Sequence, residues 1–231
     1  TANLREPRGQ DLVKGLTAKA DVLVENFKPG TLEKWGMSPD ELHETNPALI
    51  IARVSGFGQT GPYADRPGFA SVGEAMGGLR YINGFPDQPP PRSGISLGDT
   101  LTGIFAAQGV LMALYWRDAL GGGKGQVVDA SIMESCFTMM ESSLMEYDKL
   151  GIIREPSGTG LANVAPSNIY PTKDGKYVVI AANVDSMFKR LCEAMGQPEL
   201  ATDERFVDHN ARGNNVALLD GLVAEWTSTM T

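Results

Sequence analysis

Short apolar stretches that alternate with helical patterns constrain the fold of this chain more than any other feature. Three stretches have the composition of buried strands, at residues 21–25, 49–55 and 126–130. Helical patterns occupy the intervals, at residues 11–20, 31–35, 38–45 and 100–118. Strands that alternate with helices are typical of a parallel α/β sheet. We therefore predict an open, Rossmann-like parallel sheet in a large domain over residues 1–155.

The last third of the chain has a different pattern. Two apolar runs at residues 169–182 flank a Lys-Asp-Gly-Lys turn, which predicts a β-hairpin. Apolar residues at helical spacing follow at 186–196 and 215–228. We expect residues 156–231 to form a smaller α+β domain, joined to the first by a methionine-rich helix over residues 132–150.

Composition excludes several classes of partner. The net charge of -8, without a basic tract, argues against nucleic-acid binding. The longest apolar run, at residues 104–116, is too short to cross a bilayer, so no membrane partner is expected. That run is apolar nearly all round, which predicts a buried helix. Two cysteines suit a reducing cytoplasm, or an organelle matrix in a eukaryote.

Familiar ligand motifs are weak or missing. His43 and His209 are the only histidines and neither has a metal-ligand partner at useful spacing. The glycines at 56, 58 and 61 match a dinucleotide pattern, but no helix follows them directly. The glycine-rich run at residues 121–125 is typical of a flexible link.

Two segments carry candidate chemistry. Residues 26–30, with Lys34, place cations and an aromatic ring after a strand, which suits either a nucleotide contact or a solvated surface turn. Asp99 follows Gly98 where the apolar helix begins. It is either a helix N-cap or a nucleophile that forms an acyl anhydride with an activated acyl group. The residues alone leave both alternatives open.

Taken together, the motifs resemble those of the class III (CaiB/BaiF-type) coenzyme A transferases, a family that includes formyl-CoA transferase and carnitine CoA-transferase. The resemblance runs from Asn3 to Phe206. Its motifs, in order, are residues 20–30, 55–62, 97–103, 123–131 and 170–175.

The resemblance implies CoA transfer between an acyl-CoA and a small carboxylic acid, with Asp99 as the nucleophile. It implies CoA as a substrate, no metal and no permanently bound cofactor, and interlocked homodimers. The positions that match the family's CoA contacts are Asn3, Leu4, Arg5, Asn26, Phe27, Lys28, Lys34, Pro67, Gly68 and Phe69.

Departures from the family leave two alternatives. Residues 157–163 lack the consecutive glycines of formyl-CoA transferase, so a formyl/oxalate pair is not expected. The family's first strand and its returning C-terminal segment are not in the sequence, which suggests a truncated, non-catalytic chain that binds CoA or serves as an assembly partner as one alternative. The other is an α-methylacyl-CoA racemase of the same superfamily, but residues 68–72 lack its histidine.

Overall fold

The computed structural model describes residues 1–231, which divide into two compact units. The first unit comprises Thr1–Tyr81 and Arg92–Ile153, and the second comprises Ile82–Pro91 and Arg154–Thr231. Every predicted site residue belongs to the first unit.

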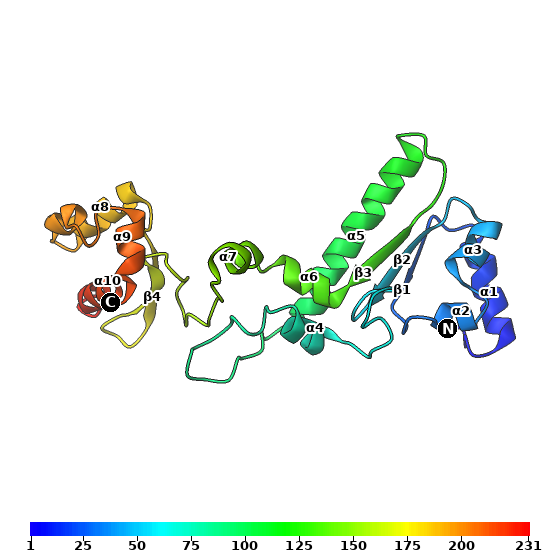
Figure 1. Ribbon diagram of the computed structural model, residues 1–231, viewed down its shortest axis with the longest axis horizontal. Helices are drawn as coiled ribbons and strands as arrows, with labels where there is room; N and C mark the ends of the chain where they lie inside the picture. The colour runs from blue at the N-terminus through cyan, green and yellow to red at the C-terminus, as the bar shows by residue number, and fades with distance from the viewer. The chain divides into compact units, whose positions relative to one another are not determined.

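The first unit is an α/β structure with a parallel sheet, as the sequence predicts (Figure 1). The three strands lie in the order β1-β2-β3, with Val22 paired to Ile50 and Ile51 paired to Val127. The elements, in chain order, are α1 (Pro7–Thr17), β1 (Val22–Glu25), α2 (Thr31–Lys34), α3 (Pro39–Thr45), β2 (Ile50–Ser55), α4 (Ala70–Met76), α5 (Leu97–Asp118), β3 (Val127–Ser131), α6 (Ile132–Thr138) and α7 (Ser143–Leu150).

The central strand β2 is covered on both faces. Leu49 and Ile51 join a core with Leu32, Met37 and Leu42 from the segment α2–α3. Ile50 and Ala52 alternate with them and are also buried, and α5 packs on β2 and β3. Burial on both faces explains why β2 reads as a continuous apolar run.

Helix α5 corrects one expectation, because it is not buried all round. Small side chains spaced along one face are buried against the sheet and its neighbours, namely Gly98, Thr102, Ala106 and Ala113. A Cβ on Gly109 would meet Val128 at 2.7 Å, so the helix and β3 are in close contact. The large apolar residues are exposed: Ile104, Leu111, Met112, Tyr115 and Trp116.

Helix α5 is also longer than the apolar run at residues 104–116, whose length was the reason to expect no membrane-spanning segment. It has 22 residues and is long and apolar enough, by length and composition alone, to cross a membrane. Core helices of folded proteins pass the same test. Here α5 packs along one face against α4, α6, β2 and β3, and 22% of its apolar window is buried.

The helices of the first unit differ from the predicted ones in two further places. The predicted helix at residues 132–150 is divided into α6 and α7, with Glu141 between them at a φ of 50°. Helix α4 lies between β2 and α5, in a stretch rich in glycine and proline where no helix is predicted. It forms because residues 70–76 contain neither proline nor a run of β-branched residues.

The second unit has a hairpin and helices around its own core. The elements are β4 (Ser167–Pro171), β5 (Tyr177–Ala181), α8 (Asp185–Ala194), the 3-10 helix η1 (Pro198–Thr202), α9 (His209–Asn214) and α10 (Val216–Thr227). Strands β4 and β5 are antiparallel, as predicted. Arg212 is fully buried among them and donates to three backbone carbonyl oxygens, those of Ala165, Asn183 and Phe206, and to the Asp185 carboxylate.

Candidate functional site

Three of the predicted site segments, at residues 26–30, at residues 67–69 and at the start of α5, lie at the carboxyl edge of the sheet. Glu25 at the end of β1 is in register with Arg53 near the end of β2, so the loops after these strands start side by side. Helix α5 begins at the same edge, since its last turn is fixed at the opposite one. There Arg117 donates to the Ala48 carbonyl oxygen at 3.0 Å and to the Asp21 carboxylate at 2.9 Å.

Asp99 is not the N-cap of α5. Ser96 occupies that position without a side-chain cap bond, and Asp99 is the third residue of the helix. The backbone N–H of Gly98 is satisfied from another helix, by the buried carboxylate of Glu74 at 3.2 Å. Asp99 is exposed, and its carboxylate has no hydrogen bond or ion pair.

The turn after β1 presents cations beside an aromatic pair. Phe27 meets Trp35 edge to face, with ring centroids 5.2 Å apart. Lys28 and Lys34 are exposed and form no ion pair, and Asn26 is exposed between them and the sheet. Gly30, at a φ of 81°, caps α2 in the left-handed region, where glycine is favoured. The turn therefore offers free ammonium groups and an aromatic surface, which suits a nucleotide.

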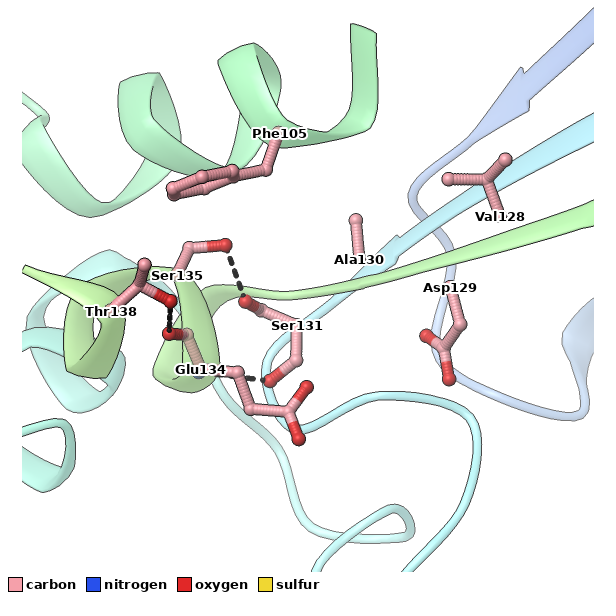
Figure 2. Close-up of a pocket in the computed structure, with 8 residues that line it drawn as sticks. All are labelled: Phe105, Val128, Asp129, Ala130, Ser131, Glu134, Ser135 and Thr138. Atoms are coloured by element: carbon pink, nitrogen blue, oxygen red, sulfur yellow. Dashed lines mark hydrogen bonds between the residues drawn. The ribbon is translucent and has the colours of Figure 1, made fainter. Parts of the chain in front are cut away.

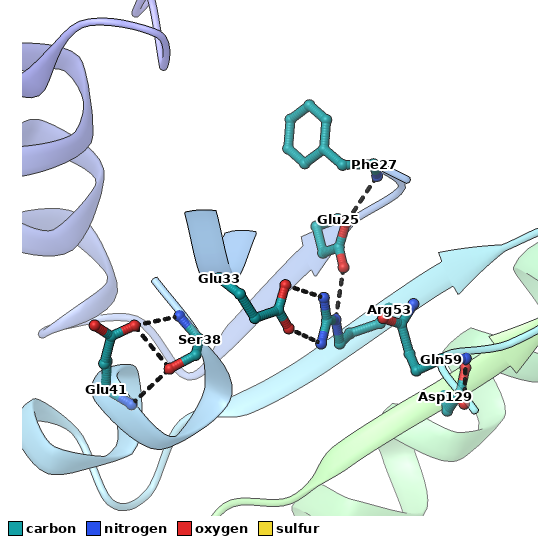
Figure 3. A network of polar contacts seen from close by, with 8 residues as sticks. All are labelled: Glu25, Phe27, Glu33, Ser38, Glu41, Arg53, Gln59 and Asp129. Carbon is teal, nitrogen blue, oxygen red and sulfur yellow. Dashed lines mark hydrogen bonds and ion pairs between the residues drawn. The ribbon is translucent and has the colours of Figure 1, made fainter. Parts of the chain in front are cut away.

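A buried charge network holds that turn in place (Figure 3). Arg53 donates to Glu25 at 2.7 Å and to both carboxylate oxygens of Glu33, at 2.7 and 3.3 Å. The second oxygen of Glu25 accepts the backbone N–H of Phe27 at 2.7 Å. The hydrogen bond from Arg53 lowers the pKa of Glu33 below its ordinary value. Arg53 thus joins the ends of β1 and β2 to α2.

Residues 67–69 are fixed to the end of β2 through two glycines. A Cβ on Gly68 would lie 2.8 Å from the Cα of Gly56, and one on Gly56 would lie 2.5 Å from the Cα of Gly68. Both positions therefore require glycine. Pro67 is exposed, and Phe69 exposes 65% of its surface directly before α4.

The predicted CoA contacts nearest the N-terminus, Asn3, Leu4 and Arg5, lie in a turn before α1. The Asn3 side chain accepts the Arg5 N–H at 3.1 Å, and the Leu4 carbonyl accepts from Gln10 at 3.1 Å. Arg5 forms no ion pair. No hydrogen bond or ion pair joins this turn to residues 26–34.

A hollow of about 180 Å³ lies elsewhere, between α5, β3 and α6 (Figure 2). None of the predicted site residues lines it. The hydroxyls of Ser135 and Thr138 donate to backbone carbonyls at 2.7 and 2.9 Å, and Asp129 accepts the Gln59 N–H at 2.8 Å. These groups are committed to the fold, so we do not assign the site to this hollow.

No group of three or more His, Cys, Asp or Glu side chains has a geometry that would hold a metal ion. His43 is partly buried, and its ring bonds to the Leu49 carbonyl oxygen at 2.8 Å.

Sequence reasoning missed two residues that organise the site, Arg53 and Glu74. A signal existed for both. Arg53 interrupts the apolar strand 49–55, and a charge buried within a strand requires a partner. Glu74 lies between small residues in Gly73-Glu-Ala-Met-Gly77, where the neighbouring helix can approach closely.

Comparison with known proteins agrees with this arrangement. The model of CoA-transferase family III matches residues 1–231. A succinyl-CoA–D-citramalate CoA-transferase from Chloroflexus aurantiacus is 58% identical over all of this chain and 57% of its own length. The alpha subunit of a succinyl-CoA–L-malate CoA-transferase from the same species is 42% identical, over all of this chain and 54% of that subunit.

A solved structure shows the same fold. The crystal structure of a CaiB/BaiF family protein from Brucella suis superposes with a TM-score of 0.81 at 36% identity. It covers all of this chain, which corresponds to 60% of the Brucella chain. The chain therefore spans little more than half the length of the proteins that it resembles. The match of the family model over every residue shows that this chain belongs to CoA-transferase family III.

Proposed function

We propose that this chain carries the nucleophile and the CoA-binding edge of a CoA-transferase. The observation that carries the proposal is Asp99, an exposed carboxylate without a partner in the first turn of α5. A backbone N–H of that turn, that of Gly98, is bonded by Glu74 instead. Asp99 stands at the sheet edge from which the CoA-contact segments leave. The relatives' names support transfer of CoA rather than racemisation.

The reaction proceeds by four acyl substitutions. A carboxylate oxygen of Asp99 attacks the carbonyl carbon of the donor thioester, the C–S bond breaks, and an aspartyl anhydride and CoA thiolate form. The thiolate attacks the Asp99 carbonyl carbon and releases the donor acid as its carboxylate, which leaves an aspartyl-CoA thioester. The acceptor carboxylate then attacks this thioester and again releases the thiolate. The thiolate attacks the acceptor carbonyl, so that acceptor-CoA leaves and Asp99 is restored.

Each step exchanges one carboxylate or thiolate for another, so no net proton or electron is required. The group that must be available is an ionised, unhindered carboxylate. Asp99 is exposed and accepts no hydrogen bond, whereas a carboxylate engaged in capping would have to break a hydrogen bond first. CoA acts as a substrate that leaves with the product.

The acids that we propose are dicarboxylic. The relatives' names pair succinyl-CoA with D-citramalate or L-malate, and succinate with glutarate, and each of these acids carries a second carboxylate. We therefore propose succinyl-CoA as donor and a four- or five-carbon dicarboxylate as acceptor. D-citramalate is the first acceptor to test, because it is named for a relative 58% identical to this chain.

We also propose that the protein works as a homodimer in the cytoplasm. The exposed apolar residues on the outer face of α5 support a partner there, since large apolar patches usually mark an interface. The expected result from light scattering coupled to size exclusion is twice the chain mass. A chain-mass peak would contradict the dimer.

Mass spectrometry tests the proposed chemistry. After incubation with succinyl-CoA, we expect an adduct on the peptide that contains Asp99, and its loss in Asp99→Asn. Asp11→Asn, the same change at an exposed residue of α1, is the control and should keep the adduct. CoA should then appear on added D-citramalate.

Other outcomes would overturn the proposal. Exchange of an α-proton of the acyl-CoA in deuterated water, without CoA exchange between acids, would indicate a racemase. Binding of CoA with neither an adduct nor exchange would leave a non-catalytic binding chain.

A further inference from the structure

Glu74 makes an unusual contact for a buried carboxylate. It lies in α4 and is only 3% exposed, yet its Oε1 accepts a backbone N–H from another helix, that of Gly98 at 3.2 Å. Its nearest cation is Arg80, whose Nη1 lies 3.9 Å from Oε2. A buried carboxylate with so loose an ion pair is costly, so its position calls for a compensating role.

Gly98 is held from both sides. Its N–H donates to Glu74, and its carbonyl accepts the hydroxyl of Thr102, which is fully buried, at 2.7 Å. A Cβ at this position would lie 3.3 Å from the Ala70 carbonyl oxygen, the Cys136 sulfur and a methyl of Ile132. The backbone of the residue before Asp99 is therefore enclosed by α4 and α6 and fixed at both polar groups.

The surroundings of Cys136 point to the same cluster. Burial raises the pKa of its thiol, and the carboxylates of Glu74 and Asp99 raise it further. A Cβ on Gly98 would lie 3.3 Å from the Cys136 sulfur, and the Glu74 carboxylate bonds the N–H of the same residue. Only one of the two carboxylates has a hydrogen bond to the protein, and that is Glu74.

We propose that Glu74 is a positioning residue for the nucleophile: by holding the Gly98 N–H it fixes the first turn of α5, so that Asp99 stays free and aimed at the acyl-CoA. Glu74 contacts Asp99 only through this backbone. The inference rests on the proposed function. Its physical basis is that attack requires the reacting atoms to be aligned at about 3–3.5 Å, and a misplacement of about 1 Å costs about 100-fold in rate.

The test compares Glu74→Ala with Glu74→Gln in the full chain, using succinyl-CoA and D-citramalate. Alanine removes the acceptor, so kcat and the rate of the Asp99 adduct should fall about 100-fold while KM changes less than about threefold. Glutamine keeps an acceptor oxygen for Gly98 N–H and should restore kcat to within about tenfold of the parent. Glu134→Ala, which removes an exposed carboxylate of α6, is the control and should leave both kcat and KM unchanged.

If Glu74→Ala does not fold, Thr102 tests the other side of Gly98. Thr102→Val removes the hydroxyl with little change of shape and should lower kcat, and Thr102→Ser should restore it. The inference is wrong if Glu74→Ala or Thr102→Val keeps the adduct rate within about twofold, if KM rises in place of a fall in kcat, or if glutamine is as poor as alanine. Absence of the adduct in the parent protein would instead overturn the proposed function itself.

Discussion

Two buried carboxylates of the first unit each accept a backbone N–H, but their ion pairs differ. Glu25 and Glu74 each accept one backbone N–H from a predicted site segment, that of Phe27 and that of Gly98. Glu25 is paired with Arg53 at 2.7 Å, whereas Glu74 has only Arg80 at 3.9 Å. The comparison indicates that the turn proposed to bind CoA is fixed by a carboxylate with a close ion pair, and the residue before the proposed nucleophile by a carboxylate with only a long one. Loss of the first should affect folding and binding, and loss of the second should affect rate.

The largest difference in stability is expected between the two arginines. Arg53→Met leaves the buried Glu25 without a cation and should lower the free energy of unfolding by about 3–5 kcal/mol. Arg80→Met breaks a long, partly exposed contact and should cost less than about 1 kcal/mol. Urea unfolding of both variants measures the difference. Equal losses would break the comparison.

The next largest difference is expected between alanine substitutions at two close-packed glycines, Gly68 and Gly98. Gly68→Ala places a Cβ 2.8 Å from the Gly56 backbone, which has no side chain to move aside, and should cost about 1–3 kcal/mol. Gly98→Ala meets three atoms at 3.3 Å and should cost less in stability. It should lower kcat, however, because the displacement occurs beside Asp99. Thermal unfolding together with kinetics distinguishes the two; a Gly98→Ala enzyme with unchanged kcat would count against tight placement of the nucleophile.

Binding should respond to Glu25 more than catalysis does. Glu25→Gln keeps an acceptor for the Phe27 N–H but weakens the pair with Arg53. The turn at residues 26–30 should loosen, so KM for succinyl-CoA should rise several-fold at nearly constant kcat. Steady-state kinetics measures both. A fall in kcat at constant KM would reverse the roles given to Glu25 and Glu74.

The smallest expected effect is a pH dependence at Glu33. The hydrogen bond from Arg53 lowers the pKa of Glu33 below 4.5, so the folded state favours its ionised form. The contribution to stability is therefore present above about pH 4.5 and is lost as the pH falls through the lowered value. Glu33→Gln should be less stable than the parent at pH 7 and should approach it near pH 3. A difference that stays constant between the two pH values would show that Glu33 acts otherwise.

The sequence predicted those parts of the fold in which a local pattern decides the structure. The strands at 21–25 and 49–55 were found because they are short, apolar and bounded by turn residues. The helix after Ser38 is predicted by a serine cap, a proline at the first helical position and acids in the first turn; in the structure Ser38 and Glu41 form a capping box. Asp99 was identified as a candidate by its glycine neighbour and its place before an apolar helix.

The remainder depends on contacts between distant segments. Whether Asp99 caps α5 could not be predicted, because the competing acceptor, Glu74, comes from a helix hidden in a loop-like stretch. The exposure of α5 could not be predicted either. Periodicity showed an apolar helix, but only tertiary packing reveals that its small residues face the sheet and its large ones face outward.

Anchoring of α5 at both ends limits how the chain can change. Arg117 fixes the last turn to the starts of β1 and β2, and Gly98 fixes the first turn to α4. Asp99 and Arg117 are about five helical turns apart and therefore lie on the same side of the helix. One inserted residue between them would turn Asp99 by roughly 100° about the axis relative to Arg117. The number of residues in this helix thus sets the direction of Asp99 relative to Arg117. We expect substitutions along the helix to be tolerated far more readily than insertions or deletions.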